Sequence, residues 1–200
     1  MQGTWLIGVD EVGRGPLAGP VGIGVVKIPV DFDWKLIPGV GDSKKVSKKK
    51  REVIFDTAKK LQQENLLDFR VELIPATYID TYGISAAIRF GLAEAIKSLA
   101  LSPEDCFIKL DGSLKAPAEF QQETIIRGDA TEPVIGLASI MAKVTRDAYM
   151  VRMDLEYPLY AFSRHKGYGT KAHCEILTQE GLCPLHRVSY CQKLVFRSRL

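Results

Sequence analysis

Segments of strand-like composition alternate along this chain with longer segments of helical periodicity, and this alternation limits the fold more than any other feature. Strands are predicted at residues 4–10, 21–28, 67–74, 106–110 and 124–126. Helices are predicted after an N-terminal cap at Ser47, at residues 85–99, at residues 133–156, and at residues 171–179 with Gly181 as the C-terminal cap. This order predicts an α/β domain built around one sheet, with a helical C-terminal region over about residues 158–200.

The length and apolar content of the chain fit one domain. With 200 residues, of which 46% are apolar, the chain can bury a core, and we expect one domain over residues 1–200 without a linker. Its apolar runs are shorter than the roughly 18 residues that a membrane span needs. The N-terminus has no basic stretch followed by an apolar core, so the expected location is the cytoplasm.

The cysteines and histidines indicate neither a zinc site nor a disulfide framework. Four cysteines are scattered without a CxxC pair, and three histidines complete no usual zinc spacing. We therefore expect buried thiols. Structural roles are also the first interpretation for Asp147, His165, His173 and His186, although a histidine can act as a proton shuttle.

Positive charge is concentrated in one short segment, although the net charge of the chain is only +3. This segment carries Lys44, Lys45, Lys48, Lys49, Lys50 and Arg51. A solvated helix face explains such a run when it is considered alone. Contact with nucleic-acid phosphates is the alternative, in which Ser43, Lys44 and Lys45 hold the backbone without reading bases.

Two adjacent acids, Asp10 and Glu11, follow the first predicted strand and precede the loop Gly13-Arg14-Gly15. Adjacent strand residues point to opposite faces, so both acids serve one site only if the strand ends there or one of them acts through its backbone. In isolation, a surface acid pair at the start of a turn is the better explanation of the dipeptide. The other acids of the chain weaken that explanation.

Asp111 and Asp129 also stand at or just beyond the ends of apolar segments, so one sheet can bring acids from separate strands to one point. Clustered carboxylates repel one another unless cations neutralise them. Hard oxygen ligands favour Mg²⁺ or Mn²⁺ over zinc or copper. Two such ions about 3.5 to 4 Å apart can activate water for hydrolysis of a phosphodiester without a covalent nucleophile.

Distinctive motifs cover nearly the whole chain: GVDEVGRGPLAGPV (8–21), DSKK (42–45), LDG (110–112), GD (128–129), ASIMAKVTRD (138–147), HKGYGT (165–170) and HRVSY (186–190). In type and order these motifs resemble those of the ribonuclease HII proteins, the type-2 RNase H family. The resemblance implies an RNase H-like α/β fold, with a central mixed sheet flanked by helices. It implies metal-dependent hydrolysis with Mg²⁺ or Mn²⁺, two ions in the active complex.

The resemblance also implies roles for individual residues. Catalysis and metal binding fall on Asp10, Glu11, Asp111 and Asp129. Recognition of the junction between a ribonucleotide and the following deoxyribonucleotide falls on Gly13, Arg14, Gly15 and Tyr168. Glycines let backbone amides approach a 2′-OH, and an aromatic ring can pack on a deoxyribose. Contacts to phosphates or to the acids are further predicted for Ser139, Lys143 and Arg146 of the long helix, for which a solvated helix face is the alternative.

The activity implied is that of an endonuclease that cuts the RNA strand of RNA:DNA hybrids. It also nicks 5′ of ribonucleotides within duplex DNA and leaves 3′-hydroxyl and 5′-phosphate ends. A type-3 relative that prefers longer hybrids is one alternative, disfavoured because Asp10 lies too near the start of the chain for an N-terminal domain. A non-catalytic hybrid-binding module is another, disfavoured by the four acids. The expected state is a monomer with no stable protein partner.

Overall fold

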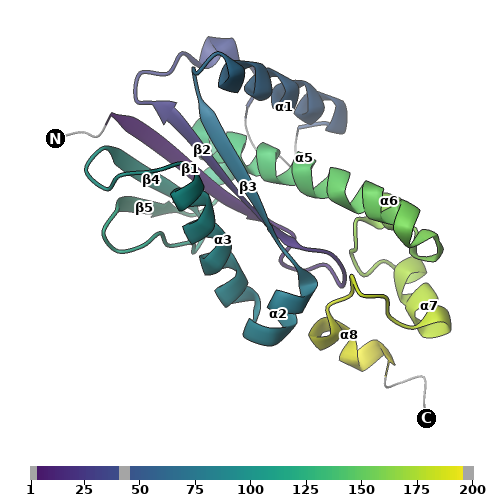
Figure 1. Cartoon of the computed structure of the whole chain (residues 1–200). Helices are drawn as coiled ribbons and strands as arrows, with labels where there is room; N and C mark the ends of the chain where they lie inside the picture. Colours follow the sequence, from purple (N-terminus) through teal and green to yellow (C-terminus); the bar gives the residue numbers. More distant parts are fainter. Residues whose placement is uncertain (1–3, 41–45, 196–200) are drawn as a thin grey trace.

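The computed structural model describes residues 4–40 and 46–195, and its centre is a five-stranded sheet of order β3-β2-β1-β4-β5 (Figure 1). The strands are β1 (Trp5–Val12), β2 (Val21–Pro29), β3 (Asp68–Ile74), β4 (Cys106–Asp111) and β5 (Gln121–Ile125). The β1–β2 and β2–β3 pairs are antiparallel, whereas β1–β4 and β4–β5 are parallel. The predicted α/β fold with a central mixed sheet is confirmed.

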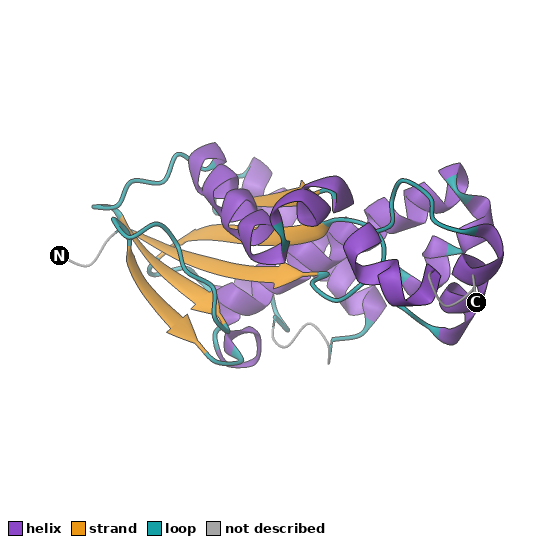
Figure 2. Cartoon of the chain, turned by 90° about the horizontal axis from the view of Figure 1, so that it is seen from below, coloured by secondary structure: helices purple, strands orange, loops and turns teal. Residues whose placement is uncertain are grey.

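Helices cover both faces of this sheet. They are η1 (Trp34–Leu36), α1 (Lys48–Gln63), α2 (Ala76–Tyr82), α3 (Ile84–Ser98), α4 (Gly128–Thr131), α5 (Pro133–Glu156), η2 (Pro158–Tyr160), α6 (Phe162–His165), α7 (Lys171–Glu180) and α8 (Val188–Val195). One core cluster lies between α3 and the sheet, and a second lies between the sheet and α1 and α5 (Figures 1 and 2). Within the described ranges no helix is long and apolar enough to cross a membrane.

Two glycines let the central strands pack directly against α5. A Cβ added at Gly8 would lie 2.2 Å from the carbonyl oxygen of Val134, and one added at Gly24 would lie 2.3 Å from that of Ala138. Contacts of that length are repulsive, so a larger residue at either position would push the helix away. The close approach places the N-terminal half of α5, including Ser139, beside β1.

The C-terminal helices α6, α7 and α8 lie beyond the sheet, beside the loop that follows β1 (Figure 1). Their apolar residues form a third core cluster around Phe162. The backbone of Leu17 donates to the carbonyl of Gly167 (2.8 Å), and that of Gly19 donates to the carbonyl of Leu185 (2.8 Å). The helical C-terminal region is thus attached to the first loop of the chain, 150 or more positions away.

All three histidines of the chain meet in this C-terminal region. The backbone N–H of Cys183 donates to Nδ1 of His186 (3.0 Å), which puts the proton of a neutral His186 on Nε2. That Nε2 lies 3.0 Å from Nε2 of His173, whose Nδ1 lies 2.9 Å from the carbonyl oxygen of Tyr168. With neutral rings, one chain of hydrogen bonds therefore runs from His186 through His173 to the backbone of Tyr168.

Acid should destabilise the fold through this cluster. Burial, followed by the neighbouring His173, lowers the pKa of His186 from 6.5 to about 4. As the pH falls, His186 takes up a proton near pH 6.5 in the unfolded chain but only near pH 4 in the folded chain. The folded state therefore has its full stability above pH 6.5 and loses stability as the pH falls from 6.5 to 4. We expect the free energy of unfolding to drop by an amount on the order of 1–3 kcal/mol from pH 7.5 to pH 5.

Denaturant unfolding at the two pH values measures this drop. The variant His186→Gln cannot take up a proton in this range and should show a shallower dependence on pH. An equal drop in the variant would assign the acid sensitivity to other groups.

Three features of the fold differ from the sequence prediction. The helix α2 and the short helix α4 were not expected, because neither has the length over which helical periodicity can be recognised. The strand β1 continues to Val12 instead of ending at Asp10. The strand β5 begins at Gln121, earlier than expected, because its residues are mostly exposed and lack strand-like apolar character.

Candidate active site

A cavity of about 510 Å³ lies where β1 and β4 end, and we call it the acid cavity. It is lined by Asp10, Glu11, Val12, Gly13, Arg14, Gly15, Arg51, Asp111, Asp129, Ser139, Lys143 and Tyr168. These residues come from strands, helices and loops that are distant in sequence. The cavity therefore brings together the four predicted acids and most of the predicted substrate-binding residues.

The pairing of the strands explains how Asp10 and Glu11 can share one cavity. The residues Ile7 and Val9 of β1 pack on the α3 side, so alternation points Glu11 to that side and Asp10 to the α5 side. The pairing of β1 with β4 ends at Val9 and Leu110. Both acids lie beyond this last pair, where the sheet opens between the two strands. The strand does not need to end at Asp10, as the sequence suggested.

The other two acids are joined by a hydrogen bond. Asp111 is the last residue of β4, and Asp129 lies in the first turn of α4. The backbone N–H of Asp129 donates to Oδ1 of Asp111 (3.3 Å). A Cβ at Gly128 would lie 2.6 Å from Cδ1 of Ile135 in α5. A glycine before Asp129 therefore lets the short helix pack close enough to place that acid in the cavity.

Two acids of this cavity, Asp10 and Glu11, are costly to ionise. Burial, together with the charges of Glu11 and Asp111, raises the pKa of Asp10 to about 8, although a hydrogen bond from Ser139 acts in the opposite direction. Burial also raises the pKa of Glu11, against the effect of Arg14, which donates to its Oε1 (3.0 Å). The other oxygen of Glu11, Oε2, is buried without a hydrogen-bond partner in the described part of the chain. A buried carboxylate oxygen without a partner is unfavourable.

This donor set fits a hard divalent cation. Carboxylate oxygens are the ligands that Mg²⁺ and Mn²⁺ prefer, and a bound cation would offset both the burial that mainly raises these pKa values and the smaller repulsion between the acids. In residues 4–40 and 46–195, no three Asp, Glu, His or Cys side chains are arranged as a ready metal site. A bound cation would therefore have to draw the carboxylates of the acid cavity closer together.

Arg146 does not make the phosphate contact that the sequence suggested. Its side chain is fully buried, and burial lowers its pKa to about 10. Its guanidinium donates to the carbonyl oxygens of Pro20 (2.8 Å), Ala18 (3.2 Å) and Lys166 (3.1 Å). Arg146 lies on the polar part of α5, as expected, but its side chain is directed at the loop after β1 and not at solvent. Arg146 therefore stabilises that loop through hydrogen bonds to its backbone carbonyls.

A second buried arginine, Arg187, was missed as a site residue. Its guanidinium donates to the carbonyl oxygens of Gly13 (2.7 Å), Arg14 (2.8 Å) and Gly19 (3.0 Å). The N–H and C=O of a trans peptide point in opposite directions, so the N–H groups of Arg14 and Gly15 point away from Arg187. Only its place in the HRVSY motif marked it, and a motif does not say what a side chain contacts.

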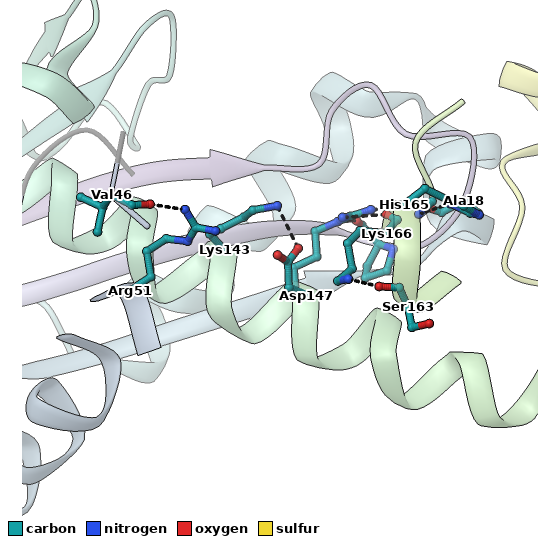
Figure 3. A network of polar contacts seen from close by, with 11 residues as sticks. Ala18, Val46, Arg51, Lys143, Asp147, Ser163, His165 and Lys166 are labelled. Atoms are coloured by element: carbon teal, nitrogen blue, oxygen red, sulfur yellow. Dashed lines mark hydrogen bonds and ion pairs between the residues drawn. The ribbon is translucent and has the colours of Figure 1, made fainter. Parts of the chain in front are cut away.

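Arg51 of α1 and Lys143 of α5 also line the acid cavity. Figure 3 shows the polar contacts that these two cations make. Lys143 forms an ion pair with Asp147 one turn further along α5 (2.9 Å), and Arg51 donates to the carbonyl oxygen of Val46 (2.6 Å). Lys143 was predicted here, whereas Arg51 was noted only as part of a basic run. The predicted phosphate ligands Ser43, Lys44 and Lys45 lie outside the described residues.

Tyr168 is 41% exposed and lines the cavity. The preceding Gly167 has φ +86°, and a Cβ there would lie 2.2 Å from the carbonyl oxygen of Ala18. The backbone of Tyr168 is held by His173, and the guanidinium carbon of Arg146 lies 5.9 Å from the ring centroid. The tyrosine is thus presented to the cavity from a backbone that is held in place.

Comparison with known proteins identifies the family. A sequence model described as Ribonuclease HII matches residues 7–194. The chain is 45% identical over 184 residues to a Ribonuclease HII of Endomicrobium trichonymphae, which covers 92% of this chain and 83% of that protein. A ribonuclease HII of Caldicellulosiruptor bescii is 40% identical over 191 residues, which covers 96% of this chain and 88% of that protein.

The fold agrees with this result. The crystal structure of ribonuclease H2 from Pyrococcus horikoshii OT3 superposes with a TM-score of 0.75 at 25% identity, and the match covers 98% of this chain and 99% of that one. The predicted RNase H-like fold is therefore confirmed. The chain belongs to the ribonuclease HII family, whose members are metal-dependent endonucleases that hydrolyse the RNA strand of RNA:DNA hybrids.

Proposed function

We propose that the acid cavity is the active site, and that the enzyme also nicks duplex DNA 5′ of a single embedded ribonucleotide. The observation that carries this proposal is one cavity that joins four acids to the Gly13-Arg14-Gly15 loop and Tyr168. The acids supply oxygen ligands for the metal ions that the proposed hydrolysis requires. The loop and the tyrosine supply groups that can distinguish a ribose from the deoxyribose that follows it.

The proposed cofactor is Mg²⁺ or Mn²⁺, with two ions in the active complex, held by Asp10, Glu11, Asp111 and Asp129. Such ions activate water and stabilise the leaving oxygen in phosphodiester hydrolysis. The buried Oε2 of Glu11, which has no partner in the described part of the chain, favours a ligand at this point. Ser139 orients Asp10 through the hydrogen bond between them.

The chain's own groups position the substrate. The N–H groups of Arg14 and Gly15 point away from Arg187, and their residues line the cavity, so they are the proposed donors to the 2′-OH. The exposed ring of Tyr168 is the proposed surface for the neighbouring deoxyribose. Lys143 and Arg51 line the same cavity and are the proposed contacts to backbone phosphates.

The two alternatives are less well supported. A hybrid-binding module without catalysis has no need for buried acids whose ionisation is costly. A type-3 relative is disfavoured because the family whose model matches is ribonuclease HII. We further propose a monomer, since one chain supplies every residue of the cavity, and a cytoplasmic location, since the four cysteines are free thiols.

One assay tests the proposed function directly. The protein is incubated with duplex DNA that contains one ribonucleotide, with Mg²⁺ or with chelator, and the product ends are mapped. We expect a metal-dependent nick 5′ of the ribonucleotide with 3′-hydroxyl and 5′-phosphate ends. Cleavage of long hybrids alone would contradict the proposed action on single ribonucleotides.

The variant Tyr168→Ala should lose activity on a single embedded ribonucleotide by roughly 10-fold to 100-fold, and lose less on a long RNA:DNA hybrid. The reason is that the ring contributes only where a deoxyribose follows a ribonucleotide. The matched variant Tyr168→Phe keeps the ring and should stay close to the parent enzyme. Steady-state kinetics on both substrates measure the difference, and equal losses on the two would show that Tyr168 does not read the junction.

A further inference from the structure

A second cavity, of about 200 Å³, adjoins the acid cavity, and we call it the basic cavity. Its floor is apolar, and its walls carry the polar side chains of Arg14, Ser85, Arg89, Ser113 and Lys115. None of its lining residues is acidic. No residue of this cavity other than Arg14 belongs to the site described above.

Two parts of the chain link the acid cavity and the basic cavity. Arg14 lines both, and its guanidinium donates to Oε1 of Glu11 (3.0 Å). The second link is the turn after β4, in which the N–H of Leu114 donates to the carbonyl of Asp111 (3.1 Å) and Gly112 has φ +62°. This turn places the carboxylate of Asp111 on the acid cavity and Ser113 on the basic cavity.

The charge of the basic cavity is positive and only partly compensated. Arg14 is paired with Glu11, but within the described residues neither Arg89 nor Lys115 takes part in an ion pair. Both are exposed, as is Ser85. A pair of cations beside hydroxyl groups, in a recess with no acid in its wall, is suited to an anion with several acceptor oxygens.

The first turn of α3 adds to this potential. The helix begins at Ile84 after Gly83, its N-terminal cap has no side-chain hydrogen bond, and its first turn carries no acid. Unsatisfied N–H groups at the start of a 15-residue helix favour a negative charge. Ser85 of this turn lines the basic cavity, so the helix end and the cations act on the same space.

We infer that the basic cavity binds a backbone phosphate of the nucleic-acid duplex whose ribonucleotide lies at the acid cavity. A strand carries one phosphate for about every 3.4 Å of helix axis, so a duplex seated on the acids brings further phosphates to the neighbouring recess. The contact fixes the register of the duplex and reads no base. This inference rests on the proposed function, because it requires the duplex to lie across the acid cavity.

The test uses the double variant Arg89→Gln/Lys115→Gln of the full chain. Binding of a fluorescent RNA:DNA hybrid of about 20 base pairs is measured in chelator, which prevents cleavage, at salt concentrations from about 0.05 to 0.3 M. We expect the dissociation constant to rise about 10-fold near 0.1 M salt. The slope of log affinity against log salt should become shallower by about 1, because each phosphate contact contributes nearly one unit.

The matched control is Lys35→Gln/Lys97→Gln, which removes the same charge elsewhere. Lys97 lies in the last turn of α3. Lys35 lies in η1, which follows β2, and the last residue of β2 pairs with the first residue of β1. Both positions are therefore at the opposite end of the sheet from the acids, and this variant should keep the parent salt slope and activity.

The outcomes separate the two proposals. An unchanged slope and affinity in Arg89→Gln/Lys115→Gln, with a parent enzyme that binds and cuts the hybrid, would overturn the basic cavity as a phosphate site. Equal changes in the two double variants would also overturn it, because they would reflect total charge alone. Failure of the parent enzyme to bind or cut the hybrid would contradict the proposed function itself.

Discussion

Asp10→Asn is expected to lower the rate of cleavage by about 10³-fold or more while the protein stays folded and binds its duplex. The carboxylate is lost as a cation ligand, but the shape of the side chain is kept. Burial already opposes the charged form of Asp10, whose pKa is raised to about 8. A neutral amide in the same place should therefore not weaken the fold.

Single-turnover cleavage of a long RNA:DNA hybrid in Mg²⁺ measures this effect. Thermal unfolding and duplex binding in chelator show whether the variant stays folded and binds. Asp31→Asn is the matched control, because Asp31 is an exposed residue in the loop after β2. It should leave cleavage unchanged. Full activity of Asp10→Asn would remove Asp10 from the active site.

Arg187→Lys is expected to reduce kcat/KM on a single embedded ribonucleotide by roughly 10²-fold, although the positive charge is kept. One ammonium group cannot replace the planar fork that reaches the carbonyl oxygens of Gly13, Arg14 and Gly19 together. The loop would then hold its N–H groups less firmly. Arg187 is a positioning residue in this account and does not itself touch the substrate.

The loss should fall mainly on kcat, and less on binding of the duplex in chelator, because phosphate contacts elsewhere remain. Arg164→Lys, at an exposed position of α6, is the matched control and should behave as the parent enzyme. Thermal unfolding of both variants shows whether the fold is retained. A folded Arg187→Lys variant with the parent kcat/KM would show that the loop needs no such support.

The positions of Asp10, Glu11 and Asp111 could be predicted from the sequence because these acids stand where an apolar strand ends or is about to end. Parallel strands bring such ends to one edge, and β1 and β4 do so for Asp10 and Asp111. The long helix α5 was predicted with its observed bounds, because Pro133 begins it and its apolar positions repeat over many turns. Features that depend on residues close together in the sequence could thus be predicted from the sequence alone.

The roles of the arginines were not accessible in this way. Arg146 and Arg187 are both fully buried, yet an arginine in a sequence suggests solvent or phosphate. Their partners are backbone carbonyls more than 100 positions away for most of these bonds, and no local pattern reveals such contacts. The short helix α4, which carries Asp129, was likewise set by packing against α5.

The hydrogen bonds from Arg187 to Gly13 and Arg14 join groups 174 and 173 positions apart. During synthesis on the ribosome the loop after β1 emerges well before the residue that holds it. A nascent chain can therefore form its sheet and gather its acids before the loop is secured. Securing the loop is therefore a late step of folding, which waits for the residues around Arg187 to pack against a segment synthesised long before them.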